Sequence, residues 1–136
     1  MSRSGYSDDC EHLELWRASV NRALRGARGQ HFLRKLLIAL DAMPTKRLVA
    51  GHLVDGTDVC ALGAVDSKVF VDPEDRDAVA RHFGIAPSMA AEIAYMNDEC
   101  QPLVWGQGET PEDRWIRMRI WVEEQIVRVE EPPDGR

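Results

Sequence analysis

The sequence predicts an α+β fold that is mostly helical, with about five helices and one small β-hairpin. Apolar residues recur at helical spacing in five segments, and three of these begin with a clear N-terminal cap signal. One Asp-Gly pair separates two apolar runs, as in tight hairpins. The length of 136 residues predicts a single globular domain over 1–129, followed by a disordered acidic tail at 130–136.

The first two predicted helices form a helical hairpin. The first begins after Asp8, where Asp8 and Glu11 fit a capping box, and ends at Gly26. The second follows Gly29 and ends before Pro44. Its apolar stripe is expected to face the core and consists of Phe32, Leu33, Leu36, Leu37, Leu40 and Met43. The few residues between the two glycine positions are expected to form a loop.

The middle of the chain changes character and favours a β-hairpin. Apolar residues fill 48–54 and 59–65, and the turn signal Asp55-Gly56 lies between them. The second run is rich in alanine and glycine, so it also fits the start of a short helix. The sequence leaves both interpretations open for 59–65.

Each of the last three predicted helices carries a proline near its start. Pro73, Pro87 and Pro111 suit the first helical turn, where the missing N–H costs nothing. Asp72 and Thr110 precede two of these prolines as N-caps. The three helices are expected to cover 72–83, 87–97 and 110–127, with a loop at 99–109.

The charge is distributed unevenly along the chain. The net charge is −6, yet residues 22–47 carry +6 and the rest carries −12. A basic block of this kind is usually solvated surface, but it is also what binding to phosphate groups requires. Gly26 and Gly29 flank Arg28 before a predicted helix N-terminus, where an anion is favoured. The candidate anion-binding or nucleic-acid-binding face consists of Arg22, Arg25, Arg28, Arg34 and Lys35.

The segment 77–96 fits a helix-turn-helix pattern. Ala80 is small where the first helix needs a small residue, Gly84 suits the turn, and Ile85 and Ile93 suit the core. The second helix of the pair, however, offers no Arg, Lys, Asn or Gln over 87–96 to read base edges. A simple bent pair of helices explains the same pattern.

The last predicted helix presents an unusual tryptophan. Trp121 lies about 240° around the helix from the core-facing Trp115, on a side that also carries Arg114 and Arg117. A tryptophan flanked by arginines is typical of the centre of a protein–protein interface. Arg114, Arg117 and Trp121 are therefore a candidate partner-binding face, unless another segment covers the ring.

The sequence identifies no catalytic residue, no cofactor-binding residue and no metal ligand. Its three cysteines are far apart, which favours a reducing cytoplasm over a disulfide framework. No apolar run approaches the length that spans a bilayer. We therefore expect a non-enzymatic cytoplasmic protein without a cofactor and without a membrane partner.

Several motifs resemble a family of small uncharacterised phage and prophage proteins. They are RSGYSDD at 3–9, RGQHFLR at 28–34, LDAMP at 40–44, VCALGAV at 59–65, AEIAYMNDE at 91–99 and TPEDRW with RMR and WV at 110–122. The resemblance implies action inside a bacterial host and transfers no catalytic residue. In that setting we expect an accessory protein that binds a host protein, for example as an inhibitor of host defence. The alternative is a nucleic-acid-binding module that uses 22–47 and the pair at 77–96, and a homodimer is compatible with either interpretation.

Overall fold

The computed structural model describes residues 13–99 and 108–127. Within these ranges the fold is α+β and predominantly helical, with six helices and one two-stranded antiparallel sheet. In chain order the elements are α1 (Leu13–Arg25), α2 (Ala27–Ala42), β1 (Val54–Asp55), β2 (Asp58–Val59), α3 (Ala61–Val65), α4 (Arg76–Phe83), α5 (Pro87–Asp98) and α6 (Pro111–Gln125). The predicted fold class is confirmed, with one helix more than expected.

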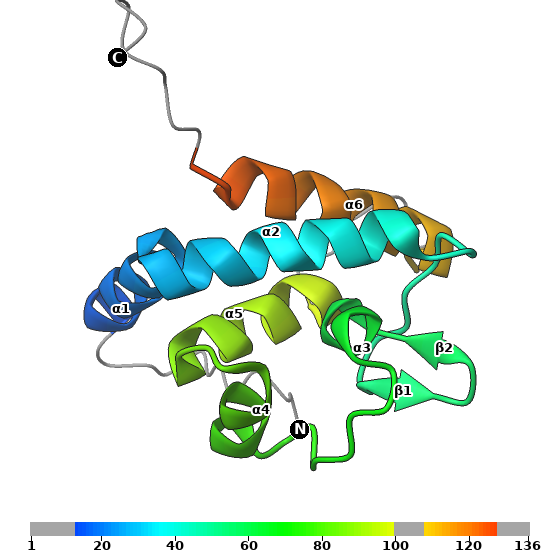
Figure 1. Cartoon of the computed structure of the whole chain (residues 1–136), viewed down its shortest axis with the longest axis horizontal. Helices are drawn as coiled ribbons and strands as arrows, with labels where there is room; N and C mark the ends of the chain where they lie inside the picture. The colour runs from blue at the N-terminus through cyan, green and yellow to red at the C-terminus, as the bar shows by residue number, and fades with distance from the viewer. Residues whose placement is uncertain (1–12, 100–107, 128–136) are drawn as a thin grey trace, which may run out of the picture.

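Helix α2 runs through the middle of the molecule (Figure 1). It packs against α6 on one side and against α3 on the other, while α5 packs against α1, α3 and α4. The side chains between these helices form one hydrophobic core. Its fully buried members include Leu33, Leu36, Met89, Ile93 and Met118. The predicted apolar stripe of α2 therefore does face the core.

Helices α1 and α2 meet at a sharp corner, so the prediction of a loop between them is wrong. Only Gly26 separates the two helices, and Gly29 already lies inside α2. A Cβ added at Gly29 would lie 1.9 Å from the carbonyl oxygen of Ala23 in α1. This glycine is therefore required by the close approach of two helices and not by a loop that cradles an anion. The Gln30 side chain reinforces the corner by donating to the carbonyl of Leu24 at 2.7 Å.

The predicted hairpin is present, but it is much shorter than expected. Val54 pairs with Val59 and Asp55 pairs with Asp58, and no further residues join the ladder. The chain then enters α3, so the helical interpretation of 59–65 is correct from Ala61 onward. Close packing explains why a helix replaces the second strand here, because the Cα of Gly63 lies against the carbonyl of Leu53 and leaves no room for a side chain.

Local cap signals located some helix ends correctly and one incorrectly. Thr110 caps α6 by accepting a hydrogen bond from the Asp113 N–H at 3.1 Å, and Gly84 ends α4 with a left-handed backbone, as predicted. Asp72 does not cap α4. It accepts from the Glu74 N–H in a preceding turn, and the helix starts one turn later, capped by Asp75.

Some predictions concern segments outside the described residues. These are the helix start at Asp8, the central part of the loop predicted at 99–109, and the tail at 130–136. The domain boundary predicted at residue 129 also lies there.

Candidate binding surfaces

The predicted partner-binding face on α6 is buried. Trp121 is 8% exposed and belongs to the hydrophobic core, and Arg114 is 7% exposed. Arg117 is half-buried and turned toward the end of α5. The prediction of an exposed tryptophan flanked by arginines is therefore wrong. The polar character of these positions reflects ion pairs with Glu109 inside the fold.

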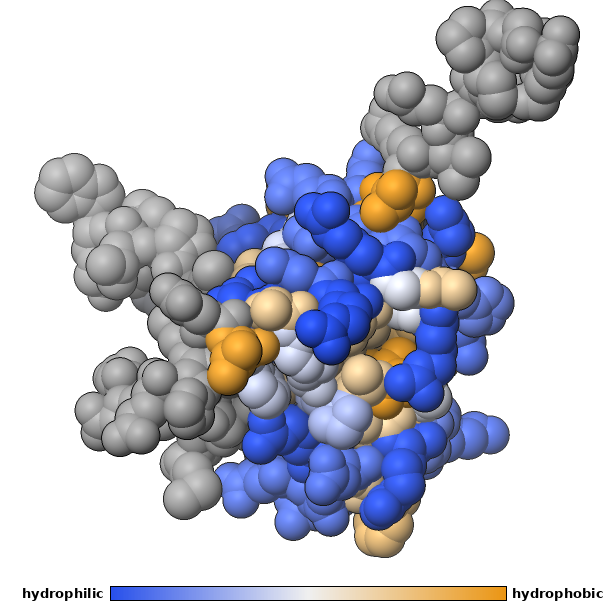
Figure 2. Space-filling model, turned by 90° about the vertical axis from the view of Figure 1, so that its left-hand side faces the viewer, coloured by the Kyte–Doolittle hydropathy of each residue, from blue (hydrophilic) through white to orange (hydrophobic). Residues whose placement is uncertain are grey.

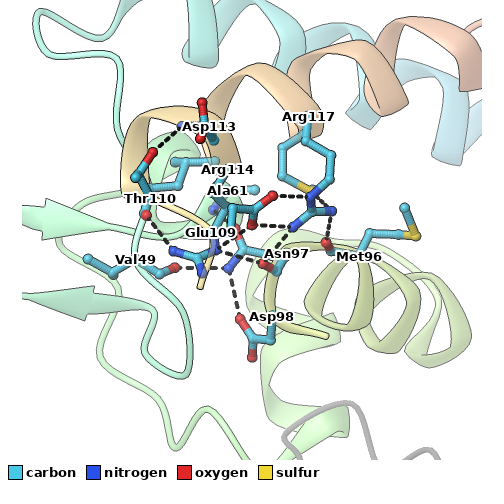
Figure 3. Close-up of polar contacts among 12 residues, drawn as sticks. Val49, Ala61, Met96, Asn97, Asp98, Glu109, Thr110, Asp113, Arg114 and Arg117 are labelled. Carbon is cyan, nitrogen blue, oxygen red and sulfur yellow. Dashed lines mark hydrogen bonds and ion pairs between the residues drawn. The ribbon is translucent and has the colours of Figure 1, made fainter. Parts of the chain in front are cut away.

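Both arginines of this face bind one buried carboxylate (Figure 3). The side chain of Glu109 is 3% exposed. Its oxygens lie 3.3 Å from Nε of Arg114 and 2.6 Å from Nε of Arg117. Arg114 also donates to the carbonyl of Leu48 at 3.1 Å, and Arg117 donates to the carbonyl of Met96. The two positive charges are thus compensated by one carboxylate and by backbone carbonyls.

Asn97, at the end of α5, connects this ion-pair group to the rest of the fold. Its side chain is fully buried, accepts from the Ala61 N–H at 3.1 Å and donates to the carbonyl of Val49 at 2.9 Å. Its backbone carbonyl accepts from Nε of Arg114 at 3.1 Å and from Arg117 at 3.2 Å. The C-terminal end of a helix carries free carbonyls and partial negative charge, so two guanidinium groups are well placed there.

These contacts assign a structural role to Arg114, Arg117, Glu109 and Asn97, because the side chains bond to one another and to backbone carbonyls within the fold. The sequence did contain a signal for the group. Arg114, Arg117 and Trp121 lie within about 60° of one another on the α6 helical wheel, and a glutamate immediately precedes the helix. A basic stripe beside a core-facing stripe fits a second buried face as well as an exposed one.

The helix-turn-helix interpretation of 77–96 is correct in its packing and wrong in its function. Ala80, Ile85 and Ile93 are buried and Gly84 forms the turn, as the pattern predicts. However, α5 is buried over most of its length, and even Glu92 is 3% exposed and paired with Arg17 at 2.8 Å. A recognition helix must expose a face to the DNA groove. Helix α5 has none to offer.

The candidate basic residues are all exposed. They are Arg22, Arg25, Arg28, Arg34 and Lys35, at the α1–α2 corner and along α2. None of them forms an ion pair with another described residue. Figure 2 looks onto the end of the molecule where α1 lies and shows a largely hydrophilic face. Arg28 and Lys35 lie about 20° apart around α2, whereas Arg34 lies about 100° further round. Arg34 donates to the carbonyl of Val127 at 3.4 Å, so it belongs to the α6 side.

The outer side of α6 exposes large apolar side chains. Ile116 is 51% exposed, Ile120 is 53% exposed, and Val127, just after the helix, is 48% exposed. We call these three residues the α6 outer row. The opposite side of α6 holds the fully buried Met118 and Val122, so the outer row is not part of the core.

Acidic residues border the outer row on both sides. Relative to Ile116 on the helical wheel, two exposed acids lie within about 40° on one side and two lie about 60° to 80° away on the other. Glu112 and Glu123 are the two on the first side, and Asp113 and Glu124 are the two on the other. A depression of about 430 Å³ lies at the C-terminal part of the row, lined by Ile120, Glu123, Glu124 and Ile126.

A second hollow lies at the other end of α2. It has a volume of about 560 Å³ and lies between the end of α2, the hairpin turn and α3. Small side chains such as Ala42 and Ala64 form part of its lining, and Arg47 and Asp58 face each other across 3.4 Å at its edge. The volume is within the range of small-molecule pockets. Its charged groups are already paired with each other, and none of them points to a particular ligand.

The described part of the chain contains no group of three or more His, Cys, Asp or Glu side chains that could hold a metal ion. No helix in it is long and apolar enough to cross a membrane. The chain matches no protein family model, no curated protein and no solved structure at a significant level.

Proposed function

We propose that this protein acts without catalysis, by binding another protein through the outer side of α6. The observation that carries the proposal is the α6 outer row, in which Ile116, Ile120 and Val127 are each about half exposed. Isolated apolar residues are common on protein surfaces, but Ile116 and Ile120 lie one turn apart on the same face of α6, and such neighbours favour an interaction site. The face around Trp121 that was predicted for this role is buried, and the outer row lies on a different side of the same helix.

Neighbouring features of α2 lie beside this surface. Ile38 is 70% exposed and lies on the same side of α2 as Arg34 and Asp41. Arg34 contacts the carbonyl of Val127, and Asp41 binds Arg119 of α6 at 2.6 Å. Ile38 therefore lies on the side of α2 that borders α6, beside the Arg119–Asp41 pair.

The resemblance to small phage and prophage proteins suggests where such binding would matter. A phage accessory protein of this size acts inside the bacterial host, and its partner would be a host protein. A component of a host defence system is one class of partner that fits this proposal. The motifs that carry the resemblance include residues at the start of α6, among them Thr110 and Trp115.

Photo-crosslinking in living bacteria tests the proposal directly. With a photoreactive amino acid in place of Ile120, we expect one discrete crosslinked product whose partner can be identified by mass spectrometry. The purified partner should then bind the wild-type protein, and an Ile116→Glu variant should bind at least tenfold more weakly. The reason is that a charge in a desolvated apolar contact is costly.

Leu15 of α1 provides the matched control. It is an exposed apolar residue of similar size, 70% exposed, on a different helix. The same photoreactive group at this position should give no discrete product, and Leu15→Glu should leave partner binding unchanged. Equal crosslinking from both positions, or none from Ile120, would contradict the proposal.

Binding to nucleic acid through the α1–α2 corner is the second candidate function. Three arginines, Arg22, Arg25 and Arg28, fall within seven residues at this corner, are exposed and make no ion pair with another described residue. Because α5 is buried, such binding would use phosphate contacts and would not read sequence. The net charge of −6 disfavours it at a distance, so contact would depend on the local basic patch.

The salt dependence of binding distinguishes this candidate. If the corner binds duplex DNA, the logarithm of the affinity should fall linearly with the logarithm of salt concentration, by about 0.9 per phosphate contact. Replacing Arg22, Arg25 and Arg28 together with alanine should reduce that slope by about 2 to 3. Fluorescence anisotropy of a labelled 20-base-pair duplex measures it, with Lys68→Ala as a control outside the corner. Absence of binding in 50 mM salt would eliminate this function.

A further inference from the structure

We propose that the α6 outer row binds a cationic amphipathic segment of a partner protein. The inference rests on the proposed function and adds the chemistry of the partner. It follows from the combination of an exposed apolar row with a border of carboxylates on both sides. A segment with an apolar stripe alone would bury these carboxylates beside uncharged groups, whereas a segment flanked by Lys or Arg would pair with them.

The border is negative on both edges. Glu112 and Glu123 lie on one edge, Asp113 and Glu124 on the other, and all four are exposed. Two described cations lie near the row. Arg119 of α6 is already bound to Glu123 at 2.8 Å and to Asp41 on α2. Arg34 of α2 donates to the carbonyl of Val127 at 3.4 Å, so the four carboxylates outnumber the cations around the row. Glu124 makes no ion pair with any described residue. The net field over the row therefore favours a positively charged occupant.

The depression at the C-terminal part of the row has the composition that a long cationic side chain requires. Ile120 and Ile126 supply apolar walls, and Glu123 and Glu124 supply carboxylates at the rim. Lys and Arg bury their aliphatic stems along apolar surface and keep the charged group at the edge. We infer that one Lys or Arg of the partner enters this depression.

The geometry of α6 limits the length of the segment and disfavours a second copy of the chain as its occupant. From Ile116 to Ile126 the helix rises about 15 Å, the length of about three helical turns. If two copies met through antiparallel α6 helices, the acids near the start of one helix would face Glu123 and Glu124 of the other. Like charges brought together at an interface are destabilising.

Two synthetic 18-residue helical peptides test the inference. Both carry the same leucine stripe, one with lysine and the other with glutamate at all remaining exposed positions. We expect the cationic peptide to bind the wild-type protein at least tenfold more tightly than the anionic one, by isothermal titration calorimetry. Amide chemical-shift changes should be concentrated at Ile116, Ile120 and Glu124. A double variant, Glu123→Lys with Glu124→Lys, should lose at least tenfold in affinity for the cationic peptide.

A second double variant, Glu74→Lys with Asp77→Lys, controls for net charge. It makes the same change in total charge near α4, where both residues are exposed. It should keep its affinity for the cationic peptide. If both double variants weaken binding equally, if both peptides bind equally, or if the shifts fall outside α6, the inference is wrong. Should loss of the Arg119 pair unfold the first variant, Glu124→Lys alone makes the same test.

The outcomes separate this inference from the proposed function. If crosslinking at Ile120 identifies a partner while Glu124→Lys leaves that partner's affinity unchanged, the protein-binding function stands and the cationic chemistry is wrong. If sedimentation shows that the protein pairs with itself through α6, and the Ile120→Glu variant abolishes this pairing, the occupant is a second copy and the inference is also overturned.

Discussion

Replacing Glu109 with alanine is expected to lower the free energy of unfolding by about 3–5 kcal/mol. The Glu109 carboxylate is 3% exposed and is the acidic partner of both Arg114 and Arg117. Its removal would leave two buried or half-buried guanidinium groups with carbonyl partners only. Since domains of this size are stable by about 5–15 kcal/mol, the loss should be visible as a large shift in the midpoint of urea unfolding.

An exposed ion pair of α6 is the matched control for this prediction. Arg119 binds Asp41 across the α2–α6 surface, and the hydrogen bond from Arg119 holds the pKa of Asp41 below its ordinary value. This pair is solvated, so Arg119→Ala should change stability far less than Glu109→Ala. A Glu109→Ala variant as stable as Arg119→Ala would show that water compensates the two arginines, which would contradict the burial of the group.

Replacing Gly63 with alanine is expected to cost about 3 kcal/mol, at the upper end of the usual cost of overpacking. An added Cβ would lie 2.0 Å from the carbonyl oxygen of Leu53 and 3.0 Å from the Cβ of Val59. The nearest obstacle is backbone, which cannot rotate away as a side chain can. Helix α3 would have to withdraw from the hairpin, which would also weaken the hydrogen bond from the Cys60 N–H to Leu53. Thermal unfolding followed by circular dichroism measures the effect.

Gly51 separates crowding from backbone conformation in this test. Its φ is +80°, but nothing lies within 4 Å of an added Cβ. Gly51→Ala should therefore cost only the strain of the left-handed conformation, about 1–2 kcal/mol. Equal losses at Gly51 and Gly63 would mean that the contact between α3 and the hairpin gives way easily, and the explanation for the short second strand would fail.

The parts of the fold that the sequence predicted correctly depend on neighbouring residues. The Thr110 cap, the Gly84 helix end and the apolar stripe of α2 each follow from interactions within a few positions of the chain. The failures depend on distant partners. Gly29 looked like a loop residue because its contact with Ala23 exists only once α1 folds back, and 59–65 is divided between strand and helix by packing against Leu53.

The candidate sites show the same limit more strongly. The sequence of α6 indicated an unusual face around Trp121, but the exposure of each side of the helix is set by segments far away in the chain. Glu109 and the end of α5 cover Arg114 and Arg117, so the apolar side with Ile116 and Ile120 remains outside. The basic residues at the α1–α2 corner were predicted to be exposed because charge runs are usually solvated. For these residues the local sequence was sufficient.

The connections made by Asn97 and the two arginines determine when the chain can finish folding. Arg114 binds the carbonyl of Leu48, 66 positions earlier, and Asn97 joins Val49 and Ala61 across 48 and 36 positions. Loops of this length close late, after local helices have formed. During synthesis, a nascent chain whose α6 has not yet left the ribosome lacks Arg114 and Arg117, which bind the end of α5. It also lacks the α6 side chains that complete the core. The contacts at the end of α5 and the core beside α6 can therefore be completed only after α6 has left the ribosome.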